Sequence, residues 1–406
     1  MKLGFEGALC RRVLRGLALW GLALWTLGTG TLLGHGGSAA QAQNLAALNL
    51  GVLAPLSGPQ KNVGLDIRDA VSLCVEQAGP EFARLGFRLG SRAFDDEHRD
   101  TVAKLRAEAM VKDRSILAVV GSYSSSVSLT AAALFSPPKL ALITPASSGT
   151  ALTAIGFDNV NRIVAREDAL GEAFATFLAL KLGAKTVHLV EDGSAGASPL
   201  LEGVSGALEA QGIKLVGRSR TARETDFSQV VDEVKKTNPD VVFYAGEYGP
   251  GAGIVRALRT ARLNMLFIGG DALSDPSFRK QAGSAFEGVY VGTVAAPAAL
   301  FKRAKAFGDA FRARFKREAS GYGVLSFDAC QVALQGLRKT LGQNPGKTPT
   351  RAQIQAEVRQ VNLVGQLSGD IRFDSRGERL KSAVFLEQYG QDGLLRVVEL
   401  VSVKAK

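Results

Sequence analysis

Hydroxyl side chains are concentrated in two short segments, each of which follows an apolar run. Residues 119–129 read VVGSYSSSVSL and residues 140–153 read LALITPASSGTALT. If a helix begins near Ser125, its first backbone N–H groups lack intrahelical acceptors and carry partial positive charge. Serine hydroxyls at such a helix start add further donors, so the pattern is typical of a site for a carboxylate or phosphate group.

The second segment adds both donors and acceptors. Ser147 and Ser148 supply hydroxyls, and the carbonyls of Ala146 and Ser147 could accept hydrogen bonds from a cationic group. The two segments together could therefore hold a small ligand that carries both charges. The same serines could equally do no more than cap helices, and the residues alone leave both interpretations open.

Short apolar runs alternate with helical patterns along most of the chain, which predicts an α/β fold. Continuous apolar strands between helices indicate parallel sheets covered on both faces. We expect strands at Leu48–Leu53, Phe87–Phe94, Ile116–Val120, Leu140–Thr144, Thr186–Val190, Leu215–Arg220, Val241–Tyr244, Leu266–Ile268 and Gly288–Val291. We also expect a helix from Asp226 to Lys236, with Asp226 as its cap.

Two stretches of similar order, one starting near Leu50 and the other near Thr186, each run from strand through a Gly/Ser loop to helix. This repeated order of elements favours two similar lobes. Ligands of open parallel sheets bind beyond the carboxyl ends of the strands. Because the serine-rich segments fall at such ends, we expect them to lie together.

The 406-residue chain is 46% hydrophobic and 21% charged, which indicates a globular protein. Residues 1–42 differ from the rest: basic residues precede an apolar stretch from Gly16 to Leu33, and Ala40 and Ala42 form a cleavage pattern. We therefore expect a signal peptide cut after Ala42 and export of the protein, with a retained membrane anchor as the alternative.

Without residues 1–42, the chain has 364 residues, 45 of them basic and 37 acidic, for a net charge of +8. One hydrophobic core usually serves roughly 250–300 residues, so two lobes are expected. The basic excess forms no Lys/Arg block, which argues against nucleic acid as a partner. Cys74 and Cys330 could form a disulfide in an oxidising compartment or remain buried thiols, and the sequence leaves this open.

The order of six segments resembles the Leu/Ile/Val-binding protein family, the type I periplasmic substrate-binding proteins of ABC importers. The segments are GVLAPLSGP from Gly51, AFDDE from Ala93, VVGSYSSS from Val119, LITPASSGTALT from Leu142, TDFSQVVDEVKKTNPDVVFYAG from Thr225 and FIGGDAL from Phe267. The resemblance covers the chain after residue 42, and it is carried by the joint order of these motifs.

This resemblance implies two doubly wound parallel-sheet lobes joined by three crossovers. One lobe would comprise residues 43–165 and 293–373, the other residues 166–292 and 374–406. It also implies a monomeric periplasmic protein that delivers a small amino acid or related polar ligand to a membrane permease. The family is not enzymatic and uses no cofactor or metal.

Site residues follow from the same resemblance. Ser125 and Ser126 match the positions that grip a ligand carboxylate, and Ala146 and Ser148 match the second loop. Asp271, in the segment GGDA, matches the carboxylate that meets an α-ammonium group. The chain departs from the family at Glu247, where an aromatic residue often stands, although Tyr248 follows it. Glu247 suggests a second donor on the ligand, but an exposed loop glutamate explains it as well.

Other functions fit the sequence less well. A ligand sensor for a membrane receptor could use the same fold, and the sequence does not exclude it. A secreted serine hydrolase needs a histidine base, but His98 lies in a polar loop and His188 lies within an apolar strand. The carboxylates of the segment DDEHRD from Asp95 are contiguous, which favours a solvated loop over a metal site. The glycines of residues 244–258 do not fit a dinucleotide fingerprint.

Overall fold

The computed structural model describes residues 45–194, 197–221 and 226–404, and the predicted signal peptide lies outside them. Residues Leu45–Lys406 form one compact unit. No helix of these described residues is long and apolar enough to cross a bilayer.

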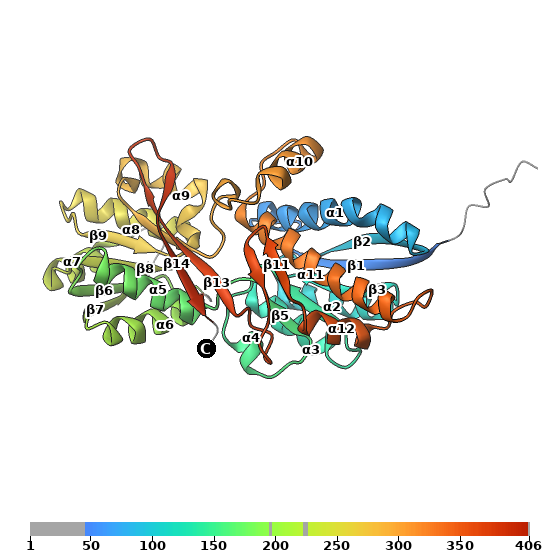
Figure 1. The fold of residues 1–406 in the computed structure, drawn as a ribbon. Coiled ribbons are helices and arrows are strands. Elements are labelled where there is room, and N and C mark those ends of the chain that lie inside the picture. Colours follow the sequence, from blue (N-terminus) through green and yellow to red (C-terminus); the bar gives the residue numbers. More distant parts are fainter. Residues whose placement is uncertain (1–44, 195–196, 222–225, 405–406) are drawn as a thin grey trace, which may run out of the picture. The chain divides into compact units, whose positions relative to one another are not determined.

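Two large sheets organise the described chain (Figure 1). The five-stranded sheet has the order β2-β1-β3-β4-β5, and all its neighbouring strands are parallel. Its strands are β1 (Ala46–Ala54), β2 (Phe87–Asp95), β3 (Ile116–Gly121), β4 (Ala141–Thr144) and β5 (Val160–Arg162).

The faces of this sheet are separated by the alternation of side chains along each strand. Leu50 and Val52 of β1 pack with α1 and α11, whereas Leu53 packs with α2 and α3. The helices of this part are α1 (Lys61–Arg84), α2 (Asp100–Lys112), α3 (Ser125–Phe135), α4 (Ala151–Ala154), α10 (Lys305–Phe315), α11 (Gly321–Gln343) and α12 (Arg351–Arg359).

The seven-stranded sheet has the order β14-β13-β10-β9-β8-β6-β7. Its strands are β6 (Thr186–Glu191), β7 (Lys214–Arg220), β8 (Val241–Ala245), β9 (Leu266–Gly269), β10 (Tyr290–Thr293), β13 (Lys381–Tyr389) and β14 (Leu395–Lys404). The first five are mutually parallel, whereas β13 and β14 are antiparallel additions at one edge.

Helices cover both faces of this sheet as well. Leu189 packs with α5 and α6, and the neighbouring Val190 packs with α7 and α8. The helices are α5 (Glu167–Leu180), α6 (Ala197–Ala210), α7 (Ser228–Thr237), α8 (Tyr248–Thr260) and α9 (Pro276–Ala282), with short 3₁₀ turns η1 (Asp271–Ser274), η2 (Gly283–Phe286) and η3 (Ala298–Leu300). The predicted helix at Asp226 is α7, and Asp226 accepts a hydrogen bond from Ser228 N at its start.

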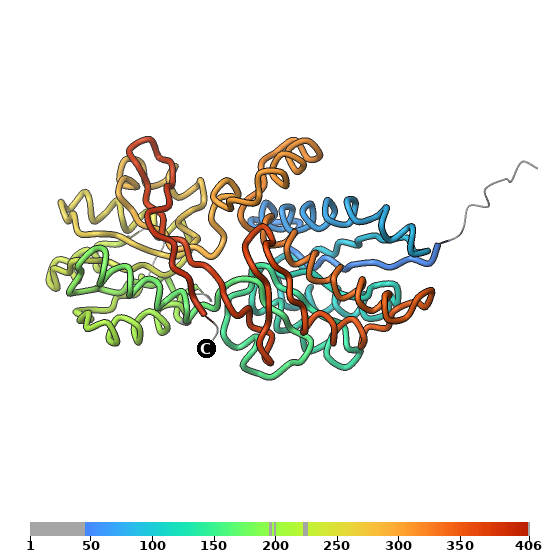
Figure 2. The backbone as a smooth tube through the Cα atoms, viewed as in Figure 1, coloured from blue at the N-terminus to red at the C-terminus, as the bar shows by residue number. Residues whose placement is uncertain are grey.

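The chain passes between the elements of the two sheets three times, after β5, after β10 and after β12, as the trace in Figure 2 shows. Strands β11 (Leu363–Gln366) and β12 (Gly369–Ile371) form a separate small sheet before the third passage. The predicted α/β class, the doubly wound sheets and the three crossovers are confirmed, and the predicted lobe boundaries remain predictions. All nine predicted strands are present, whereas β5 and β11 to β14 were not predicted.

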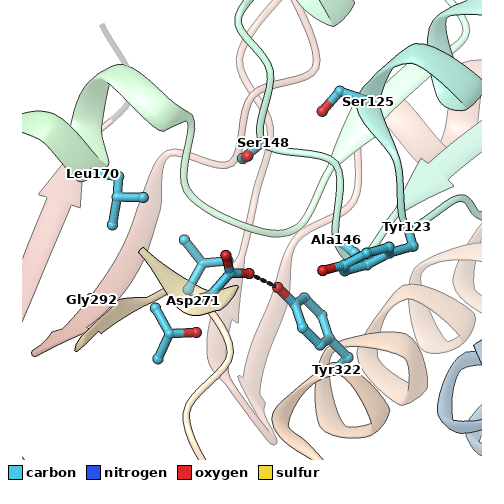
Figure 3. Close-up of a pocket in the computed structure, with 10 residues that line it drawn as sticks. Tyr123, Ser125, Ala146, Ser148, Leu170, Asp271, Gly292 and Tyr322 are labelled. Atoms are coloured by element: carbon cyan, nitrogen blue, oxygen red, sulfur yellow. Dashed lines mark hydrogen bonds between the residues drawn. The ribbon is translucent and has the colours of Figure 1, made fainter. Parts of the chain in front are cut away.

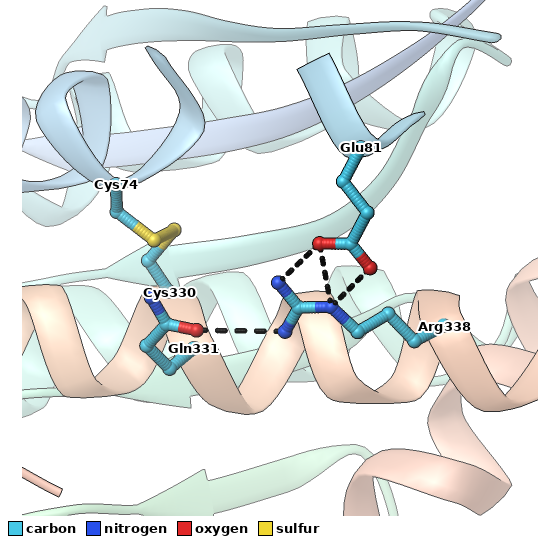
Figure 4. The surroundings of a disulfide bond; sticks show 5 residues. All are labelled: Cys74, Glu81, Cys330, Gln331 and Arg338. Atoms are coloured by element: carbon cyan, nitrogen blue, oxygen red, sulfur yellow. Dashed lines mark hydrogen bonds and ion pairs between the residues drawn. A yellow bond between two sulfur atoms is a disulfide. The ribbon is translucent and has the colours of Figure 1, made fainter. Parts of the chain in front are cut away.

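A disulfide joins Cys74 of α1 to Cys330 of α11, with Cα atoms 6.4 Å apart, which resolves the alternative left open by the sequence (Figure 4). Both helices pack on the same face of the five-stranded sheet. Near the disulfide, Arg338 of α11 donates hydrogen bonds to Glu81 of α1 at 2.9 Å. These links fix α11 against α1 along its length.

Candidate functional site

A pocket of about 160 Å³ lies where the carboxyl ends of strands from both sheets meet (Figure 3). Its lining comes from the loops after β3 and β4, from the start of α3 and from η1 after β9, together with parts of α5, β10 and α11. The residues that line it are Tyr123, Ser125, Ala146, Ser148, Leu170, Asp271, Gly292, Thr293, Val294 and Tyr322. Four of the residues predicted from the sequence, Ser125, Ala146, Ser148 and Asp271, are therefore brought together.

Ser125 is the first residue of α3, as its predicted place at a helix start requires. Its Oγ accepts a hydrogen bond from Gly149 N at 2.9 Å, which leaves its own hydroxyl proton free to be donated. A side chain at position 149 would meet Ser125 at 2.9 Å, so glycine permits the close approach of the second loop. Among the described residues, no side chain caps this helix start, so its first N–H groups remain available.

Four predicted site residues lie outside the pocket lining, and two of them, Ser126 and Ser147, are serines of the two hydroxyl-rich segments. Ser126 is exposed, and its hydroxyl donates to Asp100 Oδ1 at 2.8 Å. Ser147 is fully buried, with its Oγ 2.8 Å from Ser128 Oγ and 3.0 Å from Ser122 O. The expectation that the Ser147 carbonyl is free was wrong, because Arg162 donates to it at 2.7 Å.

Asp271 faces the serines from the side of the seven-stranded sheet. Its Oδ2 accepts a hydrogen bond from the hydroxyl of Tyr322 at 2.7 Å, as Figure 3 shows. Burial and the nearby Asp271 carboxylate raise the pKa of Tyr322 far above its usual value, so this hydroxyl is a donor at any physiological pH. The site thus has hydroxyl and helix-start donors at one end and a carboxylate at the other.

Two tyrosines that the sequence did not predict form part of the wall. The rings of Tyr123 and Tyr322 lie edge to face with centroids 5.5 Å apart, and the ring of His98 lies 5.8 Å from that of Tyr123. Tyr322 is the second residue of α11, between Gly321 and Gly323. The signal that the sequence offers is a tyrosine between two glycines at a helix start. Its neighbours in the site, Asp271 and Tyr123, lie about 50 and 200 residues away along the chain, so no local pattern brings them together.

Glu247 and Tyr248 stand at the start of α8, next to the site but outside the lining of the pocket. Glu247 is exposed, and its backbone N–H donates to Asp192 Oδ2 at 2.7 Å. Packing around part of this side chain raises the pKa of Glu247, and the nearby carboxylates of Asp192 and Asp271 raise it further. Tyr248 packs against the core cluster of α7, α8 and α9.

The two histidines have structural surroundings. His188 is buried, with Nδ1 2.9 Å from Thr237 Oγ1 and Nε2 2.6 Å from Ser219 Oγ, so it is the satisfied core histidine that the sequence predicted. Among the described residues, neither His98 nor His188 is hydrogen-bonded to Ser125. No group of three metal-ligating side chains forms in the described ranges.

The loop of residues 95–100 is only partly solvated, which corrects the sequence-based interpretation. Glu97 and His98 are exposed as predicted, but Asp96 is fully buried. Its Oδ2 accepts a hydrogen bond from Ser122 Oγ at 2.6 Å, and burial raises the pKa of Asp96. Asp96 therefore holds the loop after β3 in place through Ser122.

Comparisons with known proteins agree with the fold described above. The chain is 27% identical over 295 residues to the Leu/Ile/Val-binding protein BraC3 of Rhizobium johnstonii, covering 72% of this chain and 80% of that relative. The crystal structure of a leucine-binding protein, LivK, from Thermotoga maritima superposes with a TM-score of 0.76 at 22% identity, covering 87% of this chain and 99% of that one. A solute-binding protein of R. palustris in complex with benzoate gives 0.73 at 20% identity, covering 89% and 98%.

A family model described as "Periplasmic binding protein" matches residues 47–393, which span both sheets. This range includes every residue of the pocket described above. The chain therefore belongs to the periplasmic binding protein family.

Proposed function

We propose that the protein binds a small zwitterionic amino acid in this pocket and delivers it, as a periplasmic monomer, to an ABC importer. The observation that carries the proposal is the opposition of Ser125 and Ser148 to Asp271 across one cavity. The hydroxyls and the α3 start favour a carboxylate, and Asp271 favours an ammonium group. Charge-assisted hydrogen bonds at both ends would fix the orientation of such a ligand.

The charge of the lining favours a zwitterion over a simple carboxylate. Asp271 is the single charged side chain among the ten lining residues, and no lysine or arginine belongs to them. An aromatic acid such as the benzoate of the R. palustris protein would bring a second negative charge towards Asp271. A cavity of about 160 Å³ has room for a ligand of amino-acid size.

Ligand identification tests this proposal directly. Native mass spectrometry of freshly purified protein would reveal a molecule carried through purification. A thermal-shift panel of leucine, isoleucine, valine, threonine, alanine and benzoate would follow, since a ligand that binds only the folded form raises Tm. We expect at least one amino acid to raise Tm and benzoate to leave it unchanged. A response to benzoate alone would refute the assignment of a zwitterion.

A further inference from the structure

Arg162, the last residue of β5, is fully buried and all of its guanidinium donors are engaged. Nε and Nη2 donate to the Glu378 carboxylate at 3.0 and 3.1 Å. Nη1 donates to Ser147 O at 2.7 Å and to Gly149 O at 2.9 Å, and Nη2 also donates to Thr153 Oγ1 at 2.8 Å. A buried arginine is therefore saturated by one carboxylate, one hydroxyl and two backbone carbonyls.

The two carbonyls that Arg162 holds belong to the residues on either side of Ser148. Ser148 lines the pocket. The guanidinium of Arg162 therefore binds the backbone immediately before and immediately after the residue that faces the ligand space. On the other side of the loop, Gly149 N donates to Ser125 Oγ. The backbone around Ser148 is thus held on both sides, which determines where its hydroxyl lies.

The same arginine contacts the third passage between the sheets, and the loop that it holds contacts the first passage. Glu378 belongs to the third passage, which is paired to β5 by the hydrogen bond from Arg162 N to Gly377 O at 2.8 Å. In the first passage, Glu167 N at the start of α5 donates to Ser148 O at 3.0 Å, and Thr150 N donates to Glu167 Oε1 at 3.0 Å. The second ligand loop is therefore bonded directly to the segments that connect the two sheets.

We propose that Arg162 is a positioning residue of the ligand site, which sets the place of Ser148 and ties it to the passages between the sheets. The proposal rests on the proposed function of the pocket. A buried ion pair adds little net stability, because the desolvation of both charges offsets their attraction. The guanidinium is planar and its five N–H bonds point in fixed directions. These directions fix the positions of the carbonyls bound to Arg162, and we take this to be why an arginine stands here.

The test compares two arginines that bind backbone carbonyls. Arg351 donates to the carbonyls of Met110, Val111, Asp113 and Ile116, at the amino end of β3 and away from the pocket. The probe is whichever amino acid of the panel binds the parent most tightly, measured by calorimetry. We expect Arg162→Lys to weaken its binding roughly tenfold or more, and Arg351→Lys to change it less than about twofold.

A double-mutant cycle separates positioning from general loosening of the fold. If Arg162 acts through Ser148, Arg162→Lys should cost less than about twofold in affinity when Ser148→Ala is already present. Arg351→Lys should remain additive with Ser148→Ala. Equal losses from Arg162→Lys in both backgrounds, or equal losses from both arginine variants, would overturn the proposal. If Arg162→Lys does not fold, Glu378→Gln replaces it, with the same cycle and a smaller expected loss.

Amide hydrogen exchange supplies a readout that does not depend on the ligand. Arg162→Lys should speed exchange at Gly149 and Thr150, whose amides donate to Ser125 and Glu167, while Arg351→Lys should leave them unchanged. Unchanged exchange at these amides in Arg162→Lys would refute the positioning role even if no amino acid binds the parent. Failure of every amino acid to bind would refute the proposed function alone.

Discussion

Ion pairs beside the five-stranded sheet differ in their hydrogen bonding from two carboxylates, Asp271 and Glu387, on the side of the seven-stranded sheet. Beside the first, Arg162 pairs with Glu378, and Arg317 pairs with Asp66 and Asp69. Asp66 also accepts a hydrogen bond from Ser320 N, immediately before α11 and Tyr322. Arg162 and Asp66 therefore each hold a backbone segment that leads into the pocket.

Two carboxylates beside the second sheet, Asp271 and Glu387, have fewer partners, whereas Asp192 accepts hydrogen bonds from Ser194 N, Tyr244 and Glu247 N. Within the described residues, Asp271 accepts a side-chain hydrogen bond from Tyr322. Glu387 of β13 is 1% exposed, and its Oε1 has no partner in the part of the chain described here. The comparison suggests one side of the pocket whose geometry is fixed by internal pairs, and another side whose carboxylate, Asp271, can still accept hydrogen bonds from a ligand.

The largest effect is expected from Asp271→Asn, which removes the charge opposite the serines without changing the shape of the side chain. A bound ammonium group would be left without its counter-charge, so binding should weaken by roughly 2–5 kcal/mol. Calorimetry with the tightest amino acid at pH 7 measures this. Asp275→Asn is the matched control, because Asp275 accepts a hydrogen bond from Ser277 N at the start of α9 and lies outside the pocket lining. Equal losses in both variants would contradict the assignment.

Cys330→Ser tests how firmly the five-stranded half is held. The disulfide closes a sequence separation of 256 residues, so its loss should lower the free energy of unfolding by about 2–4 kcal/mol. Urea unfolding of the variant, compared with the oxidised parent, measures the change, and the parent in reductant should unfold like the variant. Because the Asp66–Arg317 pair still holds the start of α11, affinity should change less than about threefold. A large loss of affinity with little loss of stability would show that the disulfide acts on the site itself.

Glu387→Gln tests the incomplete pairing beside the seven-stranded sheet. Burial raises the pKa of Glu387 to about 7, so the folded protein favours its protonated form. The stabilisation from this group is complete below the unfolded-state pKa near 4.5 and is lost as pH rises through 7. Relative to the parent, the variant should gain about 3 kcal/mol of stability between pH 4.5 and pH 8. Urea unfolding at the two pH values measures this difference, and a difference that does not change with pH would contradict it.

Much of the fold could be predicted because its strands are local apolar runs between helices. β14 was missed because it alternates exposed and half-buried residues, whereas the prediction relied on continuous apolar strands. β13 was missed although it contains four consecutive buried residues, Val384 to Glu387, because the last of them is a glutamate that shortens the apolar run. Their place beside β10 depends on a chain return of about 90 residues, which no local pattern specifies.

The site was predictable where its chemistry is local and not where it depends on packing. Ser125 could be placed because helix starts have a recognisable sequence. Ser126 and Ser147 have the same residue type and neighbourhood, yet one side chain turns to Asp100 and the other to buried carbonyls. Such contacts set the direction of each hydroxyl. They also set the role of Arg162, whose partners lie from 9 residues away, at Thr153, to 216 residues away, at Glu378.

The neighbouring serines Ser125 and Ser126 also have different contacts, so their alanine variants should differ by a smaller change in affinity. Ser125→Ala removes a hydroxyl that lines the pocket and accepts from Gly149 N, so amino-acid binding should weaken by about 1–1.5 kcal/mol. Ser126→Ala removes a hydroxyl that donates to exposed Asp100 and should change affinity by less than about 0.5 kcal/mol. Calorimetry of the pair measures both, and the reverse order would place the ligand carboxylate at Ser126.

The smallest effect is expected from Glu247→Gln, next to the site on the half with fewer pairs. Its carboxylate is exposed and lies outside the pocket lining, so solvent screens its attraction for a ligand ammonium. For an amino acid with a neutral side chain, affinity should fall by less than about 0.5 kcal/mol. Titrations of parent and variant with norleucine and lysine, which differ in a terminal amine, sharpen the test. A loss above tenfold for lysine alone would make Glu247 a direct contact for a second cationic group, and would extend the ligand space beyond the pocket described here.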